Sequence, residues 1–341
     1  MTEKLSSIQT GLSANRWVCT LASLRLTLVL LILFAIGVVG WHFSDPRWRD
    51  HLIAWPLLML AINLVAALLS HPTFRSQAWL LMFHLGLLVL LIVIAVGQLT
   101  MLLGEVEVTN GTAYDSRVAS WHQGYLHSNK LDHLTFELID FSIHYEPEGG
   151  IANRKETRAH LRWKNEEGTE LEGVVGDKVG LRLQGYRFNT THNKGFALWF
   201  EWQPKIGQNT EGAVHLPPWP ANEFEQVVEW QIPGTSHQLW AQLKFDDPIL
   251  SNSQPSEFRK PKDSQLVVRY DDQRHQLSPG EFIEFPDGRL VYKELRTWMG
   301  FRIFYDWTLP WLLAAGLVAV FGLAGHFWRK YAPRPWLAEE T

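Results

Sequence analysis

Four long apolar stretches dominate the pattern of hydrophobic and polar positions along this chain. They are residues 26–43, 52–69, 78–103 and 309–327, and none of them contains Asp, Glu, Lys or Arg. Each comes close to or exceeds the roughly 18 apolar residues that cross the hydrocarbon of a bilayer. The pattern predicts a membrane protein with four transmembrane α-helices, three N-terminal and one C-terminal.

The first stretch has an alternative interpretation, as the apolar core of a cleaved signal peptide. Residues 26–43 are long for that role, no small-residue cleavage site follows them, and a second apolar stretch begins soon afterwards. We therefore expect the stretch to be kept as a transmembrane helix.

Residues 104–306 follow a different pattern, in which apolar and polar residues alternate in short runs bounded by turn residues. A period of two is typical of half-buried strands. The runs are residues 134–141, 158–164, 179–188, 196–202, 227–232, 238–245 and 266–271. We expect an inserted all-β domain, built as an antiparallel sandwich or an open barrel.

Two segments of this region call for separate predictions. Residues 246–263 are rich in Ser, Pro, Asn and Lys, which indicates an exposed loop. Residues 290–302 lead back to the membrane, where aromatic side chains are expected to form an interfacial belt. The predicted belt consists of Trp298, Phe301, Phe304, Tyr305, Trp307 and Trp311.

Segments that carry Lys and Arg next to transmembrane helices tend to lie in the cytoplasm. The segments before the first stretch, between the second and third stretches and after the last stretch carry such residues, which are Lys4, Arg16, Arg25, Arg75, Arg329, Lys330 and Arg334. The loop between the first two stretches has no net charge, so it can lie outside. The predicted organisation is a cytoplasmic N-terminus at 1–25, three transmembrane helices at 26–103, an extracytoplasmic β-rich domain at 104–306, a fourth transmembrane helix at 307–328 and a cytoplasmic tail at 329–341.

Charge and cysteine content exclude several functions. The net charge of −4 and the absence of a long basic run give no reason to expect a nucleic-acid partner. The only cysteine is Cys19, on the predicted cytoplasmic side. The outer domain therefore contains no disulfide, no thiolate metal site, no Cys-x-x-Cys pair for thiol exchange and no Cys-x-x-Cys-His motif for attaching haem to the chain itself.

Away from their ends, the apolar stretches contain three polar side chains that need an explanation, namely Asn63, His84 and Gln98. We interpret Asn63 and Gln98 as groups that hydrogen-bond between helices. His84 lies about 10 Å from the cytoplasmic end of its helix at a rise of 1.5 Å per residue. A neutral imidazole there either hydrogen-bonds a neighbouring helix, the commoner role of a lone membrane histidine, or acts as an axial ligand to haem iron.

Gly86, close to His84, would let a flat ring or another helix approach. No second histidine lies at a similar depth, since the others near the spans are at their ends, so a haem bound by His84 would take its other ligand from another chain. The outer domain contains His122, His127, His133, His144, His160, His192, His215, His237 and His275. They show no metal-ligand spacing and are expected to be scattered surface residues, although His122 and His127 follow the membrane closely enough to reach an exported ligand.

The topology and three local motifs resemble the ResB or CcsB proteins of cytochrome c biogenesis, the pathway called System II. The motifs are His84-Leu85-Gly86 early in the third span, the step into Gly104-Glu105-Val106, and Leu-Gln-Gly-Tyr-Arg-Phe at residues 183–188, which is similar to the family's Gly-Tyr-Arg-Phe-type strand. The outer domain is shorter than in many members and rich in tryptophan. These tryptophans are expected in the sheet core or at its rim, and they are Trp163, Trp199, Trp202, Trp219, Trp230 and Trp240.

The resemblance implies a haem-binding subunit of a membrane complex that exports haem and joins it to apocytochrome c. His84 would be one axial ligand of a haem b in transit, with the other supplied by a ResC or CcsA subunit that has a tryptophan-rich haem-handling motif. This chain would be a non-catalytic subunit of the holocytochrome c synthase, or haem lyase, and separate proteins would keep the apocytochrome thiols reduced. It would lie in the bacterial inner, or cytoplasmic, membrane with its large domain in the periplasm or outside.

Two other functions remain open on sequence grounds. A b-type subunit that oxidises quinol and transfers electrons would need haem sites with two histidines inside its own helices. A non-enzymatic membrane anchor whose β domain binds an extracytoplasmic protein would contain no haem.

Overall fold

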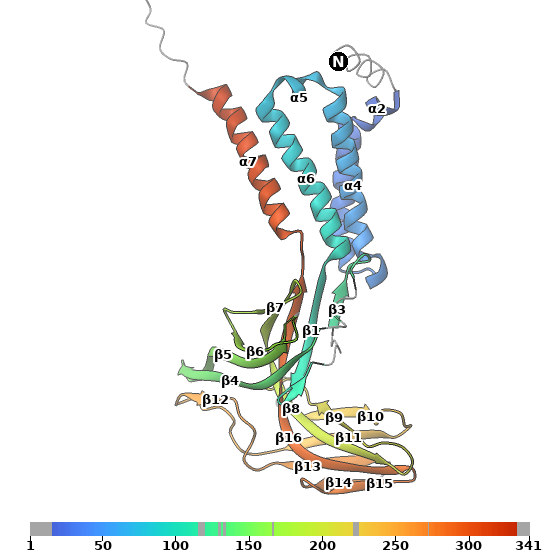
Figure 1. The fold of residues 1–341 in the computed structure, drawn as a ribbon, viewed down its shortest axis with the longest axis vertical. Coiled ribbons are helices and arrows are strands. Elements are labelled where there is room, and N and C mark those ends of the chain that lie inside the picture. The colour runs from blue at the N-terminus through green and yellow to red at the C-terminus, as the bar shows by residue number, and fades with distance from the viewer. Residues whose placement is uncertain are drawn as a thin grey trace, which may run out of the picture. The chain divides into compact units, whose positions relative to one another are not determined.

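The computed structural model describes residues 16–114, 120–128, 131, 134–165, 167–220, 225–271 and 273–332. The chain divides into two compact units, shown with their elements in Figure 1. The helical unit takes the described residues within Met1–Leu102, His122–Ser128 and Tyr305–Thr341, and the β unit takes those within Leu103–Trp121 and Asn129–Phe304.

The helical unit confirms the predicted membrane helices. Its elements are α2 (Arg16–Leu21), α3 (Leu24–Trp41), α4 (Pro46–Ser70), α5 (Pro72–Ser76), α6 (Ala78–Thr100) and α7 (Leu309–Tyr331). Among the described residues, α3, α6, α7 and the part of α4 from Trp48 are long and apolar enough to cross a membrane. A helix suits these sequences because it satisfies every backbone polar group within the segment, which the hydrocarbon requires.

Glycine allows α6 and α7 to pack closely. A Cβ added to Gly86 of α6 would lie 2.6 Å from the backbone nitrogen of Ala319 in α7, and one added to Gly322 would meet the backbone at Phe83. Small residues at such crossings let two helix backbones come into contact. Of the two uses expected for Gly86, the close approach of another helix is the one observed.

Asn63 joins three helices. Its Oδ1 accepts a hydrogen bond from the Thr27 hydroxyl of α3 at 2.7 Å, and its Nδ2 donates to the carbonyl of Leu21 in α2. The side chain is almost completely buried in α4, so the predicted hydrogen bonding between helices is confirmed. The same interpretation of Gln98 stays a prediction.

The short segment 122–128 belongs to the helical unit because its backbone binds the end of α6. The amide of Gly124 donates to the carbonyl of Met101, and the amide of Leu126 donates to that of Leu99. The last carbonyls of a helix have no partner within the helix, and this segment supplies donors to them.

The β unit contains three sheets whose registered strand pairs are antiparallel. The first sheet has the order β3 (Ser120–Gln123), β1 (Leu102–Thr109), β16 (Gly288–Tyr305), β8 (Tyr186–Pro204) and β7 (Leu181–Leu183), with β15 (Phe282–Phe285) on β16 and β9 (Thr210–His215) on β8. The second has β12 (Ser256–Glu257), β4 (Phe136–Glu148), β5 (Ile151–Lys164) and β6 (Glu170–Gly176), with β2 (Thr112–Ala113) on β4. The third has β10 (Val227–Gln231), β11 (Gln238–Lys244), β13 (Gln265–Tyr270) and β14 (Gln273–Leu277).

The segment that resembles the family's strand motif forms a tight hairpin. Leu183 of β7 pairs with Tyr186 of β8, and the two residues between them, Gln184 and Gly185, both have positive φ. Two consecutive positive φ angles are the requirement of a type I′ turn, whose twist matches that of the strands. Tyr186 and Phe188 then point into the core and are fully buried.

Two predictions for this unit were wrong. Trp298 and Phe301 are not part of a membrane belt, because the segment back to α7 continues as strand β16 and buries both side chains completely. Residues 246–263 are not simply an exposed loop, since Ile249 and Phe258 are buried. The six outer tryptophans fulfil their prediction, with Trp202 and Trp219 buried and the others partly buried.

Candidate functional site

His84 is held on α6 by a hydrogen bond within its own helix. Its Nδ1 lies 2.7 Å from the carbonyl oxygen of Leu80, one turn earlier. A carbonyl can only accept, so Nδ1 is the donor of this bond, and the tautomer with its proton on Nδ1 has the lone pair on Nε2. Among the described residues, no hydrogen bond or ion pair reaches Nε2. The expected alternative of a bond to a neighbouring helix is therefore not the arrangement observed.

Two aromatic rings surround this imidazole. The ring of Phe74, on the short helix α5, lies with its centroid 4.5 Å from that of His84 at an angle of 59°, and the ring of Phe83 lies at 4.9 Å. His84 is only partly buried. A neutral imidazole with a free Nε2, a backbone acceptor on Nδ1 and apolar neighbours is the donor that haem iron takes from a protein.

No second histidine of the described residues contacts the ring of His84. His42 follows α3 directly, His71 precedes α5, and His326 lies near the end of α7. No group of three His, Cys, Asp or Glu residues in the described part of the chain is arranged to hold a metal ion. Among the described residues of the helical unit, His84 therefore has no second imidazole beside it.

A second polar cluster lies where α3 and α4 are joined. His122 Nε2 lies 2.8 Å from Oδ1 of Asp50, although neither atom makes a well-aligned hydrogen bond among the described residues. The ring of Trp41 meets that of His122 edge-on, with centroids 5.5 Å apart. His127 Nδ1 donates to the carbonyl of Thr100 at 2.7 Å. Both histidines are largely buried, so the expectation of exposed surface histidines was wrong for them.

Histidines of the β unit pair with carboxylates that are distant in sequence. His215 lies 2.9 Å from Glu107 through Nδ1 and 2.8 Å from the Thr109 hydroxyl through Nε2. His237 Nε2 lies 2.6 Å from Asp287, and the hydrogen bond from His237 lowers the pKa of that carboxyl. These two are therefore structural groups rather than scattered surface histidines. His133 lies outside the described residues.

Lys194 is the buried cation of the β unit. Its ammonium lies 5.5 Å from the ring centroid of Tyr145 and 5.9 Å from those of Trp219 and Phe258. Burial, helped by repulsion from Arg154, lowers its pKa to about 8. Aromatic faces stabilise an ammonium, and the burial nevertheless favours its neutral form.

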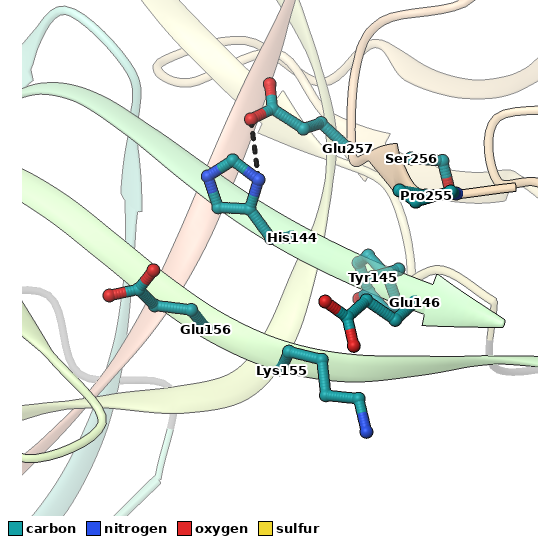
Figure 2. A pocket seen from close by; sticks show the side chains of 8 residues that line it. All are labelled: His144, Tyr145, Glu146, Lys155, Glu156, Pro255, Ser256 and Glu257. Atoms are coloured by element: carbon teal, nitrogen blue, oxygen red, sulfur yellow. Dashed lines mark ion pairs between the residues drawn. The ribbon is translucent and has the colours of Figure 1, made fainter. Parts of the chain in front are cut away.

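A pocket of the β unit has a volume of about 370 Å³ and lies over β4, β5 and β12 (Figure 2). In it His144 Nδ1 lies 2.8 Å from Glu257. Its lining consists of His144, Tyr145, Glu146, Lys155, Glu156, Pro255, Ser256 and Glu257. It is open and carries charges of both signs. Of its residues, only His144 belongs to the outer histidines that the sequence offers as candidate ligands.

The model of the ResB-like family matches residues 75–187 of this chain. This range includes His84, Gly86 and the Gly185-Tyr186-Arg187 hairpin, so the predicted resemblance to the ResB/CcsB family is confirmed. No curated protein matches the chain. Among solved structures, one match is a chain titled Cytochrome c Heme Lyase CcmF, with 14% identity and a TM-score of 0.24, over 88% of this chain and 34% of that one. This chain therefore spans about a third of the length of that structure, and so distant a likeness is evidence for neither activity nor partner.

Proposed function

From the ResB-like match and the four membrane helices, we propose that this chain is the haem-binding subunit of a membrane complex that exports haem and attaches it to apocytochrome c. His84 binds the iron through Nε2, and a membrane subunit of the ResC or CcsA type supplies the second axial ligand. The observation that supports this most is the hydrogen bond from Nδ1 of His84 to Leu80, which leaves Nε2 as the ligand atom.

The closed face of α6 supports the same assignment. The backbone of α7 packs against Gly86, so a flat ring cannot lie against this glycine unless α6 and α7 separate. The imidazole of His84, two residues away, points from a different face of the helix because successive residues are about 100° apart. We place the haem on the face of His84, beside α5, and not against the glycine.

The chemistry of attachment belongs to haem and to the substrate. Vinyl groups of the haem would form thioether bonds with the thiols of a Cys-x-x-Cys-His segment of the substrate. The β unit of this chain has no thiol of its own, since the one cysteine of the sequence, Cys19, is in α2. The subunit would be non-catalytic. Its work is to hold the iron at His84 while the β unit docks apocytochrome c for the partner, in the inner membrane of a bacterium with the β unit outside.

The test is co-expression with a partner subunit, followed by measurement of haem in the purified complex and of cytochrome c maturation in cells. For His84→Ala we expect loss of most of the haem and at least a tenfold fall in maturation, because the ligand bond is lost. His326→Ala, on α7, is the matched control and should retain both. Unchanged haem and maturation in His84→Ala would reject the assignment.

The two rival functions give different results in the same preparation. A quinol-oxidising b-type subunit would show stoichiometric low-spin haem in the chain purified alone, which is not favoured because His84 is the only histidine that lies well inside an apolar stretch of the sequence. A membrane anchor would show no haem with or without a partner.

A further inference from the structure

The short helix α5 brings an aromatic side chain against the proposed ligand. Its five residues, Pro72–Ser76, connect α4 to α6. Proline suits its first position because that residue has no partner for an amide hydrogen and needs a fixed φ. Phe74 lies in the middle of this helix, and its ring is 4.5 Å from that of His84.

Two contacts restrict the imidazole. The carbonyl of Leu80 takes the Nδ1 proton, and the ring of Phe74 lies against the imidazole at an angle of 59°. The last torsion of a histidine is broad and has two preferred orientations. Without a neighbour the ring can make a half-turn, which exchanges Nδ1 with Cδ2 and Nε2 with Cε1. That turn breaks the hydrogen bond to Leu80 and moves the lone pair of Nε2 away from its present direction. Phe74 hinders that rotation.

We infer that Phe74 is a positioning residue, which holds the His84 imidazole so that Nε2 faces the haem. This inference rests on the proposed function of His84. A ligand fixed before binding loses less rotational freedom when the metal arrives, so its affinity rises. The connecting helix α5, which has no other assigned role, thereby becomes part of the haem site.

Phe83 does not provide the same restraint. Its ring also touches that of His84, at 4.9 Å, but it is the preceding residue on the same helix and its backbone lies against Gly322 of α7. Any residue at this position would remain beside His84 whatever its size. Phe74 reaches His84 from a separate element, so its contact depends on its own side chain.

The experiment titrates haemin into the purified full-length chain in detergent and follows the absorbance. The ferrous sample is then examined by resonance Raman spectroscopy for the iron–histidine stretching band, which responds to the orientation and hydrogen bonding of the imidazole. Phe74→Leu should weaken haemin binding about tenfold, the lower end of the effect of removing an outer contact to a metal ligand. The band should shift or broaden.

Three further variants make the result decisive. Phe74→Tyr keeps the ring and should restore both affinity and band. His71→Ala should behave as the unchanged chain, because the ring of His71 contacts Phe74 at 6.2 Å and not His84. If Phe74→Leu does not fold, as judged by its helical circular dichroism, Phe74→Met replaces it with the same expected outcome.

The proposal and its premise fail in different ways. If His84→Ala abolishes the band while Phe74→Leu leaves affinity and band unchanged, Phe74 is not a positioning residue and the proposed function stands. If His84→Ala leaves haemin binding and band unchanged, His84 is not the ligand, and both the proposed function and this inference are wrong.

Discussion

At the scale of single residues, Lys194 shows how burial changes the chemistry of a side chain. Its pKa of about 8 in the folded chain is below the ordinary value of 10.5. Between these two values the unfolded chain binds more protons than the folded chain, so the free energy of unfolding rises with pH across this window. Below pH 8 the charged amine is the buried form, and its desolvation costs up to about 3 kcal/mol.

Replacing this amine should therefore stabilise the protein at neutral pH. We expect Lys194→Met to unfold at a higher temperature than the unchanged chain at pH 7, with the difference shrinking as the pH approaches 10.5. The measurement is thermal unfolding of the detergent-solubilised chain, followed by the circular dichroism of the strands. Lys293→Met is the control, since the ammonium of Lys293 is half-exposed and lies 3.1 Å from Glu201. A gain that does not change with pH would contradict the assignment of the cost to charge.

The sequence pattern shows where polar residues lie along the chain, but it does not show which of them contact one another in the fold. The spacing of His84 and Leu80 is visible in the sequence, because residues four apart lie together on a helix. The pairing of His215 with Thr109 or of His122 with Asp50 joins residues far apart, so no local period reveals it. A single sequence could indicate these clusters only as unexplained polar residues next to apolar runs.

At the scale of elements, the contact between α6 and α7 depends on the absence of a side chain. Gly86→Ala would place a methyl group 2.6 Å from the backbone of Ala319. Overpacking of this kind costs about 1–3 kcal/mol, so the variant should unfold at a lower concentration of sodium dodecyl sulfate. Gly316→Ala, on α7, has open space around the new methyl and should unfold like the unchanged chain. Equal midpoints for the two variants would show that the helices separate at no cost.

The strands were predicted better in kind than in extent. Period-two alternation identified segments of β4, β5, β10, β11 and β13, but it divided β8 between two runs and predicted no run over β16. Both strands contain irregularities in their pairing, at Tyr292/Glu294 and Met299/Phe301, where the alternation changes phase. A bulge inserts an extra residue, so a strict period fails there although the strand continues.

At the scale of the whole molecule, hydropathy was sufficient for the fold class. Along the chain, three apolar helices precede the β-rich region and one follows it, as the composition of each stretch predicts. The environment of aromatic residues was harder to predict, because a membrane interface and a sheet core both favour them. Trp298 lies in the sheet core, where its indole donates a hydrogen bond to the carbonyl of Leu216. The candidate haem ligand was predicted by its depth and its family motif, whereas its ring neighbour Phe74 depends on how α5 folds back.

The central claim is that Nε2 of His84 ligates haem iron. The most direct test removes this side chain and supplies free imidazole in its place. His84→Gly in the complex with its partner should lose the low-spin haem spectrum, and added imidazole should restore it by occupying the space of the missing side chain. His326→Gly should neither lose the spectrum nor respond to imidazole. A low-spin spectrum that persists in His84→Gly without imidazole would contradict the account.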